Sequence, residues 1–163
     1  MSAPKGYTRT QIALHWVVFL LVALQFLFHN NIVDAWGSYL RDGTFEPSAL
    51  VFSHVIGGIL ILLLVIWRMA IKVKRGAPEL PENEPPMLKL AANLTHIGLY
   101  LLLLLTALSG AVAWFGSVEA AAQVHGVLRA LVLILVLLHI AGAFYQQLVL
   151  KSDVMTRMGK PEA

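Results

Sequence analysis

Long uninterrupted runs of apolar residues alternate with short polar segments along this 163-residue chain. A stretch of about 17–25 predominantly apolar residues can cross the hydrocarbon core of a bilayer as a helix. Four runs reach this length and predict transmembrane helices at about residues 11–29, 48–71, 90–115 and 120–148. The pattern therefore predicts an all-α protein, an integral membrane four-helix bundle in which residues 1–163 form a single membrane domain.

The composition supports a membrane protein and removes several kinds of chemistry. Hydrophobic residues make up 58% of the chain and charged residues only 13%, whereas soluble domains have about 45–50% and about 25%. The chain contains no cysteine. Disulfides, thiolate-bound iron–sulfur clusters and covalently attached c-type haem are therefore excluded, and any haem must be bound non-covalently.

The distribution of basic residues predicts the orientation in the membrane. Arg41 is the one basic residue in the first connection between predicted helices, and the third connection has none. Ten basic residues are expected on the other side of the membrane: Lys5, Arg9, Arg68, Lys72, Lys74, Arg75, Lys89, Lys151, Arg157 and Lys160. Because basic residues favour the cytoplasmic side, both termini and the second connection are expected in the cytoplasm.

The two longer connections differ in composition. The first, residues 30–47, is acidic and is compatible with a short surface helix. The second is rich in proline and is expected to be an extended linker; its prolines are Pro78, Pro81, Pro85 and Pro86.

Histidines within the apolar runs are the most informative polar residues. Five of the six histidines lie there, and an ionisable side chain in hydrocarbon is costly enough to be a functional candidate by default. The predicted topology places three at each depth: His15, His96 and His139 towards the inner side, and His29, His54 and His125 towards the outer side. Since two imidazoles can ligate one haem iron, each side has candidates for one haem.

The spacing within the fourth run points to a shared scaffold. His125 and His139 are fourteen residues apart, which is about 21 Å of helical rise and nearly four whole turns. Both side chains therefore project from nearly the same face at two depths, so one helix could ligate two stacked haems in a bundle. Glycines near the histidines would allow a helix or a macrocycle to approach closely: Gly57, Gly58, Gly126 and Gly142.

Four other polar residues have ordinary structural interpretations beside functional ones. His29 lies at an interface, where a solvated histidine needs no special role. His96 could bind a quinone headgroup, hydrogen-bond a haem propionate or bridge two helices. Arg68 either extends its charge to the interface or pairs with a propionate. Arg129 lies deeper, so a propionate or a water-filled cavity is needed to explain its charge.

Several motifs together resemble a known family. The first helix opens with Tyr7, Arg9, Gln11, His15 and Trp16, and the later motifs are His54 followed by glycine, Arg68, Asn93-x-x-His96-x-x-x-Tyr100, the His125–His139 pair, and Lys151-x-Asp153-x-x-x-Arg157-Met158. This arrangement is similar to bacterial cytochrome b561, and the similarity spans essentially the whole chain.

The resemblance implies a bacterial inner-membrane protein with two b haems held between helices. His15 and His139 would bind the inner haem, and His54 and His125 would bind the outer haem. Members of the family exchange electrons with quinone, and one that oxidises superoxide and reduces ubiquinone is the nearest functional model. The resemblance assigns no separate catalytic residue.

Three functions are compatible with these features. The leading hypothesis is a superoxide:ubiquinone oxidoreductase in the lipid bilayer, with Arg129 and Arg41 as the outer basic residues that could attract the anion. The second is a cytochrome subunit or electron carrier for a separate dehydrogenase or periplasmic partner. The third is a non-redox pathway, lined by histidines, for a metal ion or protons. None of them involves nucleic acid.

Overall fold

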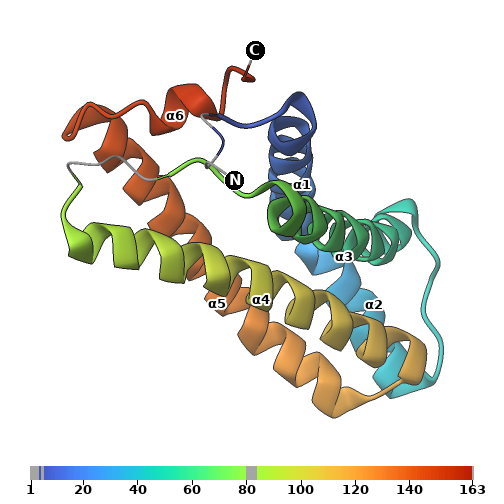
Figure 1. Cartoon of the computed structure of the whole chain (residues 1–163). Helices are drawn as coiled ribbons and strands as arrows, with labels where there is room; N and C mark the ends of the chain where they lie inside the picture. The colour runs from blue at the N-terminus through green and yellow to red at the C-terminus, as the bar shows by residue number, and fades with distance from the viewer. Residues whose placement is uncertain (1–3, 5, 80–83, 163) are drawn as a thin grey trace.

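The computed structural model describes residues 4, 6–79 and 84–162, and every regular element in that part of the chain is helical (Figure 1). Lys5 and Pro81, which were used in the sequence argument, lie outside the described residues. The elements are α1 Arg9–Leu27, α2 His29–Asp42, α3 Ala49–Arg75, α4 Pro86–Gly116, α5 Glu119–Leu148 and α6 Val154–Arg157. Helices α1, α3, α4 and α5 are long and apolar enough to cross a membrane, which confirms the predicted all-α membrane bundle.

Local sequence signals explain where these helices begin. Thr8 and Gln11 form a reciprocal cap, with Gln11 N donating to Thr8 Oγ1 at 3.1 Å and Thr8 N donating to Gln11 Oε1 at 3.0 Å. Ser48 caps α3 by accepting from Val51 N at 3.2 Å. Pro86 occupies the first turn of α4, where its missing N–H costs nothing.

The first connection forms a helix of its own. The chain leaves α1 at Phe28, and His29 is the first residue of α2 rather than the end of the first transmembrane helix. The hydroxyls of Tyr39 and Ser117 are 2.8 Å apart, so α2 is joined to the end of α4. These contacts place α2 across the end of the bundle where α4 turns into α5.

The four long helices pack in sequence rather than as a closed ring. Helix α1 packs on α3, α3 packs on α4, and α4 packs on α5 along most of its length. Among the described residues, α5 makes no comparable backbone approach to α1 or α3. In Figure 1, α1 and α3 form one wall, and α4 with α5 forms the other. Side chains of α5 therefore meet those of α1 and α3 across the middle of the bundle.

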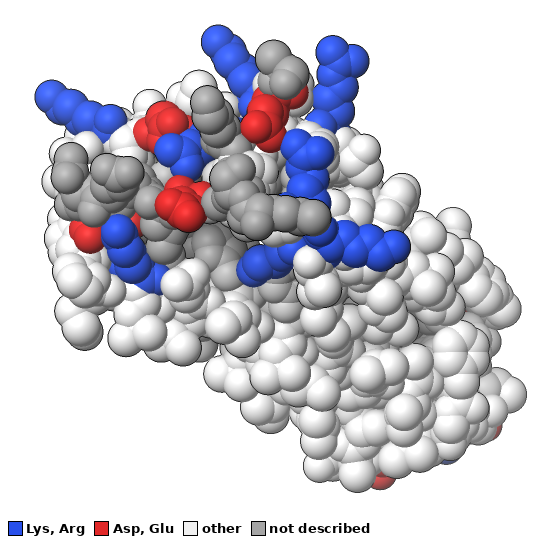
Figure 2. Space-filling view, in the orientation of Figure 1, with Lys and Arg blue, Asp and Glu red and all other residues white. Residues whose placement is uncertain are grey.

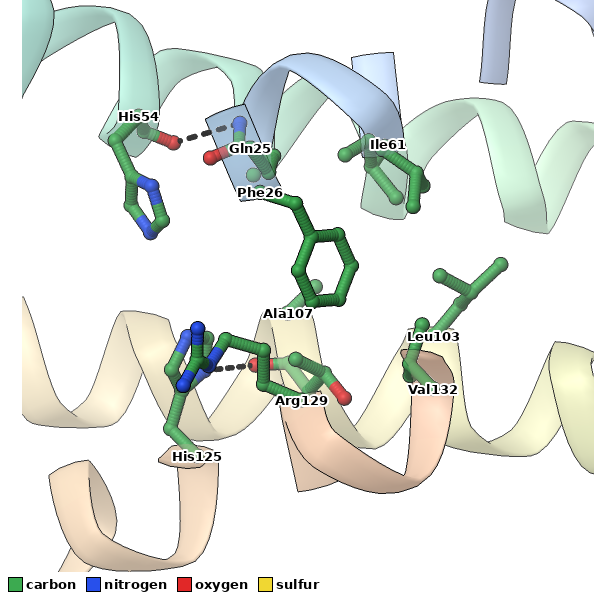
Figure 3. A pocket seen from close by; sticks show the side chains of 12 residues that line it. Gln25, Phe26, His54, Ile61, Leu103, Ala107, His125, Arg129 and Val132 are labelled. Carbon is green, nitrogen blue, oxygen red and sulfur yellow. Dashed lines mark hydrogen bonds between the residues drawn. The ribbon is translucent and has the colours of Figure 1, made fainter. Parts of the chain in front are cut away.

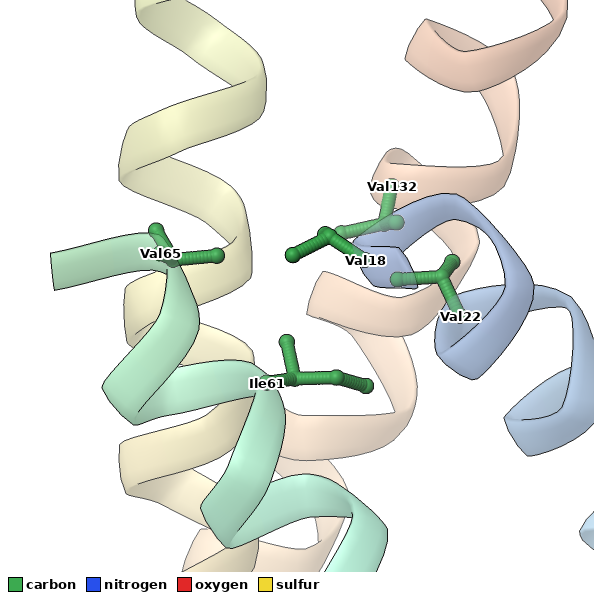
Figure 4. Close-up of a cluster of buried hydrophobic side chains, with 5 residues drawn as sticks. All are labelled: Val18, Val22, Ile61, Val65 and Val132. Atoms are coloured by element: carbon green, nitrogen blue, oxygen red, sulfur yellow. The ribbon is translucent and has the colours of Figure 1, made fainter. Parts of the chain in front are cut away.

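Five buried apolar side chains form a layer halfway along the bundle (Figure 4). Val65 on α3 is 1% exposed and Val132 on α5 is 2% exposed. The other members come from α1 and α3: Val18, Val22 and Ile61. Val132 lies seven residues from both His125 and His139, so this layer separates the two depths at which those histidines lie.

Most charged side chains lie at one end of the molecule, here called the basic end (Figure 2). This end is formed by the start of α1, the end of α3, the start of α4, the end of α5, and α6. The chain termini meet there, because Glu162 N donates to the carbonyl of Tyr7 at 2.9 Å and Arg75 pairs with the Glu162 carboxylate at 2.9 Å. The indole of Trp16 also donates to the carbonyl of Met158 at 3.1 Å. The C-terminal segment thus covers the N-terminal end of α1.

Candidate functional site

His54 and His125 face each other at the end of the bundle away from the basic end. His54 projects from α3 and His125 from α5, and their ring centroids are 6.3 Å apart with the ring planes inclined by 72°. Figure 3 shows the two rings on opposite walls of a pocket. This is the pair that the resemblance assigned to the outer haem.

A small cavity of about 70 Å³ lies beside this pair, and its lining is mainly apolar. The apolar side chains come from α1, α3, α4 and α5 and include Val22, Phe26, Ile61, Leu103 and Val132. Gly58 lines it as well, and a Cβ built there would meet no atom within 4 Å. An apolar lining with a few polar groups is the character expected for a small-molecule or cofactor site.

Hydrogen bonds hold both walls of this pocket. The carbonyl of Thr106 accepts from His125 Nδ1 at 2.8 Å, so Nε2 of His125 is left unprotonated and able to ligate a metal. On the other wall, Gln25 Nε2 donates to the carbonyl of His54 at 3.1 Å. Gly57 makes room for that contact, because a Cβ there would collide with the Gln25 amide.

Several polar atoms around the pocket are buried without a hydrogen-bond partner among the described residues. They are Gln25 Oε1, His54 Nδ1, Thr106 Oγ1 and Arg129 Nε. Buried polar atoms are nearly always satisfied, so a cluster of exceptions calls for an explanation. Their position around one apolar cavity fits a ligand that is largely apolar and has polar or anionic edges.

His29 joins this pair from the start of α2. Its ring centroid is 6.2 Å from that of His54. Burial lowers the pKa of His29, and the nearby charge of Arg129 and the ring of His125 lower it further. His29 does lie at the end of the bundle, as the sequence indicated. It is partly buried and packed near another histidine, however, and is not simply solvated.

A second histidine cluster lies at the basic end. The ring centroids of His15 on α1 and His139 on α5 are 6.1 Å apart. His96 on α4 comes to 5.1 Å from His139 in a nearly edge-to-face arrangement. His96 is exposed, whereas His15 and His139 are partly buried. The structure thus brings all three inner candidates together around His139.

Arg68 is the central cation of this inner cluster. Its Nη2 donates to Nδ1 of His15 at 3.2 Å, and its Nη1 is buried without a partner among the described residues. The guanidinium carbon lies 6.0 Å from the centre of the Tyr100 ring, and the Lys72 ammonium lies 5.3 Å from it. This corner could therefore receive an anionic or carbonyl-bearing group.

The two opposed pairs have the spacing that a bis-imidazole metal site requires. A metal–imidazole bond of about 2 Å on each side, with the ring radii added, separates the ring centroids by about 6 Å. The observed 6.1 Å and 6.3 Å match this span, and so does the 6.2 Å between His29 and His54. Among the described residues, no group of three His, Asp or Glu side chains is arranged to hold a bare metal ion. The residues present therefore fit haem iron better than an unchelated ion.

Membrane-crossing helices that oppose imidazole pairs at two depths define a class of protein, the membrane electron-transfer cytochromes. The chain belongs to one family of that class, prokaryotic cytochrome b561, whose family model matches residues 6–161. Membership implies b-type haem, electron transport and a location in a membrane. It argues against the non-redox histidine pathway considered from the sequence.

Individual relatives agree with the family. The chain is 33% identical over 162 residues to cytochrome b562 of Cereibacter sphaeroides, with 99% of each chain covered. It is 31% identical over 102 residues to the probable superoxide oxidase CybB of Yersinia pestis, covering 60% of this chain and 52% of that protein. It is 29% identical over 104 residues to cytochrome b561 homolog 1 of Escherichia coli, covering 64% and 56%. The chain thus spans about half the length of the last two.

Proposed function

We propose that this chain is a di-haem b cytochrome of a bacterial inner membrane that passes electrons from the outer side to ubiquinone, with superoxide as the donor. The observation that carries the proposal is the pair of ring separations, 6.1 Å for His15–His139 and 6.3 Å for His54–His125. Bound at these pairs, haem would supply a one-electron carrier near each face of the membrane.

The orientation follows from the charges. The basic end would face the cytoplasm, since basic residues favour that side. Both termini and the α3–α4 connection would then be cytoplasmic, and α2 would lie at the outer surface. His15 and His139 would form the inner site, and His54 and His125 the outer site. Helix α5 contributes to both sites, about 21 Å apart along its axis.

The arginines would bind the anionic edges of the cofactors. Arg68 has a buried nitrogen without a partner beside His15, and Arg129 has one beside the cavity at His54 and His125. Each could pair with a propionate, and a charge-assisted bond of this kind is stronger than a neutral one. Each would also compensate a buried charge that otherwise lacks a partner.

The inner cluster offers the quinone site. His96 is exposed beside His139, so its ring can donate to a quinone carbonyl that arrives from the lipid. Reduction of one ubiquinone to ubiquinol takes up two electrons and two protons. Two superoxide anions supply the two electrons and leave as two molecules of dioxygen. The protons would enter from the cytoplasmic side, which is the side of the inner cluster.

The proposal is tested on the purified protein in detergent. Pyridine haemochrome measurement should give two b haems per chain, both low-spin in the oxidised spectrum. Superoxide should then reduce the haem signal, and added ubiquinone should reoxidise it. A haem content near zero or one would contradict the di-haem assignment. Two haems that superoxide fails to reduce would contradict the donor alone.

A second function has specific support. A relative that matches over 99% of its length is named cytochrome b562, whereas the superoxide oxidase matches over 102 residues. The outer end also carries acidic residues that would repel superoxide: Asp34, Asp42, Glu46 and Glu119. The chain would then carry electrons for a separate dehydrogenase or periplasmic partner. Reduction of the haems by a co-purified partner, and not by superoxide, would favour this function.

A further inference from the structure

The ring of His125 lies directly against the backbone of α4 at Gly110. A Cβ built on Gly110 would lie 2.9 Å from both Nδ1 and Cε1 of that ring. Real Cβ atoms are not found so close to another heavy atom, and a ring held at its own helix cannot bend away like the end of a flexible chain. Only glycine at position 110 therefore permits the observed place of His125.

The same turn of α4 also fixes the direction of the ring. Thr106, one turn before Gly110, accepts the Nδ1 proton of His125 at 2.8 Å. Ser109 donates its hydroxyl to the same carbonyl at 2.9 Å, and its oxygen lies 3.5 Å from His125 Nδ1, at the long limit of a hydrogen bond. A carbonyl oxygen has two lone pairs, so Ser109 and His125 compete for a carbonyl that also serves the helix. Residues 106–110 thus control both the position of the imidazole and the strength of its hydrogen bond.

We propose that residues 106–110 of α4 form a positioning element that holds His125 as a ligand and sets its basicity. This inference rests on the proposed function, since it assigns the element to the outer haem. Helix α4 contributes no ligand to that haem, but it would select the tautomer in which Nε2 of His125 is free. A hydrogen bond from the second nitrogen makes a ligating imidazole more basic.

The two histidines of the outer pair differ in the hydrogen bond that Nδ1 makes. Nδ1 of His54 is buried and has no hydrogen-bond partner among the described residues, whereas Nδ1 of His125 has the Thr106 carbonyl. His125 would therefore be the stronger donor of the two and the better-oriented ring. Changes to the element should act on the outer haem alone, because its contacts are with His125 and not with the inner cluster.

Gly110→Ala tests the position of the ring, and Gly98→Ala is the matched control. Gly98 lies on the same helix, and its added Cβ would come 2.8 Å from Leu135 Cδ1 on the same partner helix. That atom ends a flexible side chain and can move aside. Haem content and a potentiometric redox titration of the purified holoprotein are the readouts. A His54→Ala variant, which should retain only the inner transition, assigns the two signals.

Gly110→Ala should either lose the outer haem or raise its reduction potential, because the displaced ring gives up the Thr106 carbonyl. Loss of a supporting hydrogen-bond partner commonly weakens metal binding about 10- to 100-fold. The inner transition should stay in place, and Gly98→Ala should resemble the parent protein. Two unchanged transitions in Gly110→Ala, or an equal effect in Gly98→Ala, would overturn the inference.

Ser109→Ala provides a milder test that should not affect folding. Removing the competing donor strengthens the bond from His125, so both haems should be retained and the outer potential should fall. An unchanged or raised potential of the outer haem in Ser109→Ala would overturn the inference. This result is decisive even if the Gly110→Ala variant cannot be purified. Failure of the proposed function is a separate result, since the parent protein itself would then lack two haems.

Discussion

Arg68 Nη2 lies 3.2 Å from Nδ1 of His15, and the contact fixes the roles of both atoms. A guanidinium only donates, so Nδ1 of His15 accepts and its proton lies on Nε2. Ligation of a metal through Nε2 requires that nitrogen to be free of its proton. Loading of the inner haem is therefore expected to move Arg68 away from Nδ1, towards a propionate.

Arg68→Gln should lower the reduction potential of the inner haem, because a positive charge that favours the reduced state is removed. At an effective dielectric constant of about 20, a unit charge about 4 Å away contributes about 4 kcal/mol, and the contribution falls in inverse proportion to distance. Arg68→Lys keeps the charge and should retain most of the parent potential. A redox titration of both variants shows whether the charge of Arg68 or its shape sets the potential of the inner haem. Equal shifts of that potential in the two variants would mean that charge is not the cause.

Single alanine substitutions of the histidines should separate the two sites. His54→Ala and His125→Ala should each lose the outer haem, and His15→Ala and His139→Ala should each lose the inner one. Pyridine haemochrome quantitation with redox titration measures which haem remains. His29→Ala is the control and should retain both haems, although its ring lies 6.2 Å from His54.

His96 gives the inner assignment a direct competitor, because its ring is closer to His139 than the ring of His15 is. His96→Ala should keep the inner haem and weaken the reaction with ubiquinone. Loss of the inner haem from His96→Ala, with its retention in His15→Ala, would reassign the ligand pair to His96 and His139.

The sequence was sufficient for the features that depend on one helix at a time. Apolar length predicted the four long helices, and the interval between His125 and His139 predicted two depths on one face. The helix ends were less predictable: α3 continues to Arg75, four residues beyond the expected end. A helix that projects past the hydrocarbon needs no apolar side chains, so hydropathy could not mark its end.

Features that depend on contacts between helices were not predictable. Gly110 and Thr106 were not among the sequence candidates, because only the packing of α4 on α5 places them against His125. The signal available was Ser109-Gly110, a pair of small residues in a helix rich in leucine. In the same way, the glycines near the histidines have different surroundings: Gly57 accommodates Gln25, whereas a Cβ built on Gly126 or Gly142 would meet no atom within 4 Å.

The valine layer should contribute to stability through packing. Val65→Ala removes two methyl groups from a side chain that is 1% exposed, and the resulting cavity should cost about 1–2 kcal/mol. Val73→Ala is the matched control on the same helix, since Val73 is 85% exposed. Thermal unfolding of the haem-loaded variants in one detergent measures the difference. A Val65→Ala variant as stable as Val73→Ala would show that the layer is loosely packed.

The last prediction concerns how a superoxide anion would reach the outer site. Arg129 lines the outer cavity, and its guanidinium carbon lies 5.9 Å from the centre of the Phe26 ring. Arg129→Gln should slow reduction of the haems by superoxide and flatten its dependence on ionic strength, since attraction between opposite charges is screened over about 10 Å at 0.1 M salt. Arg41→Gln, on α2 at the surface, is the control for a general loss of positive charge and should have the smaller effect.

The outer haem's potential must be measured in both variants, because loss of a propionate partner would also slow the reaction by lowering that potential. A slower reaction with an unchanged potential and a weaker salt dependence would assign Arg129 to steering. An unchanged rate in Arg129→Gln would mean that superoxide approaches without this charge.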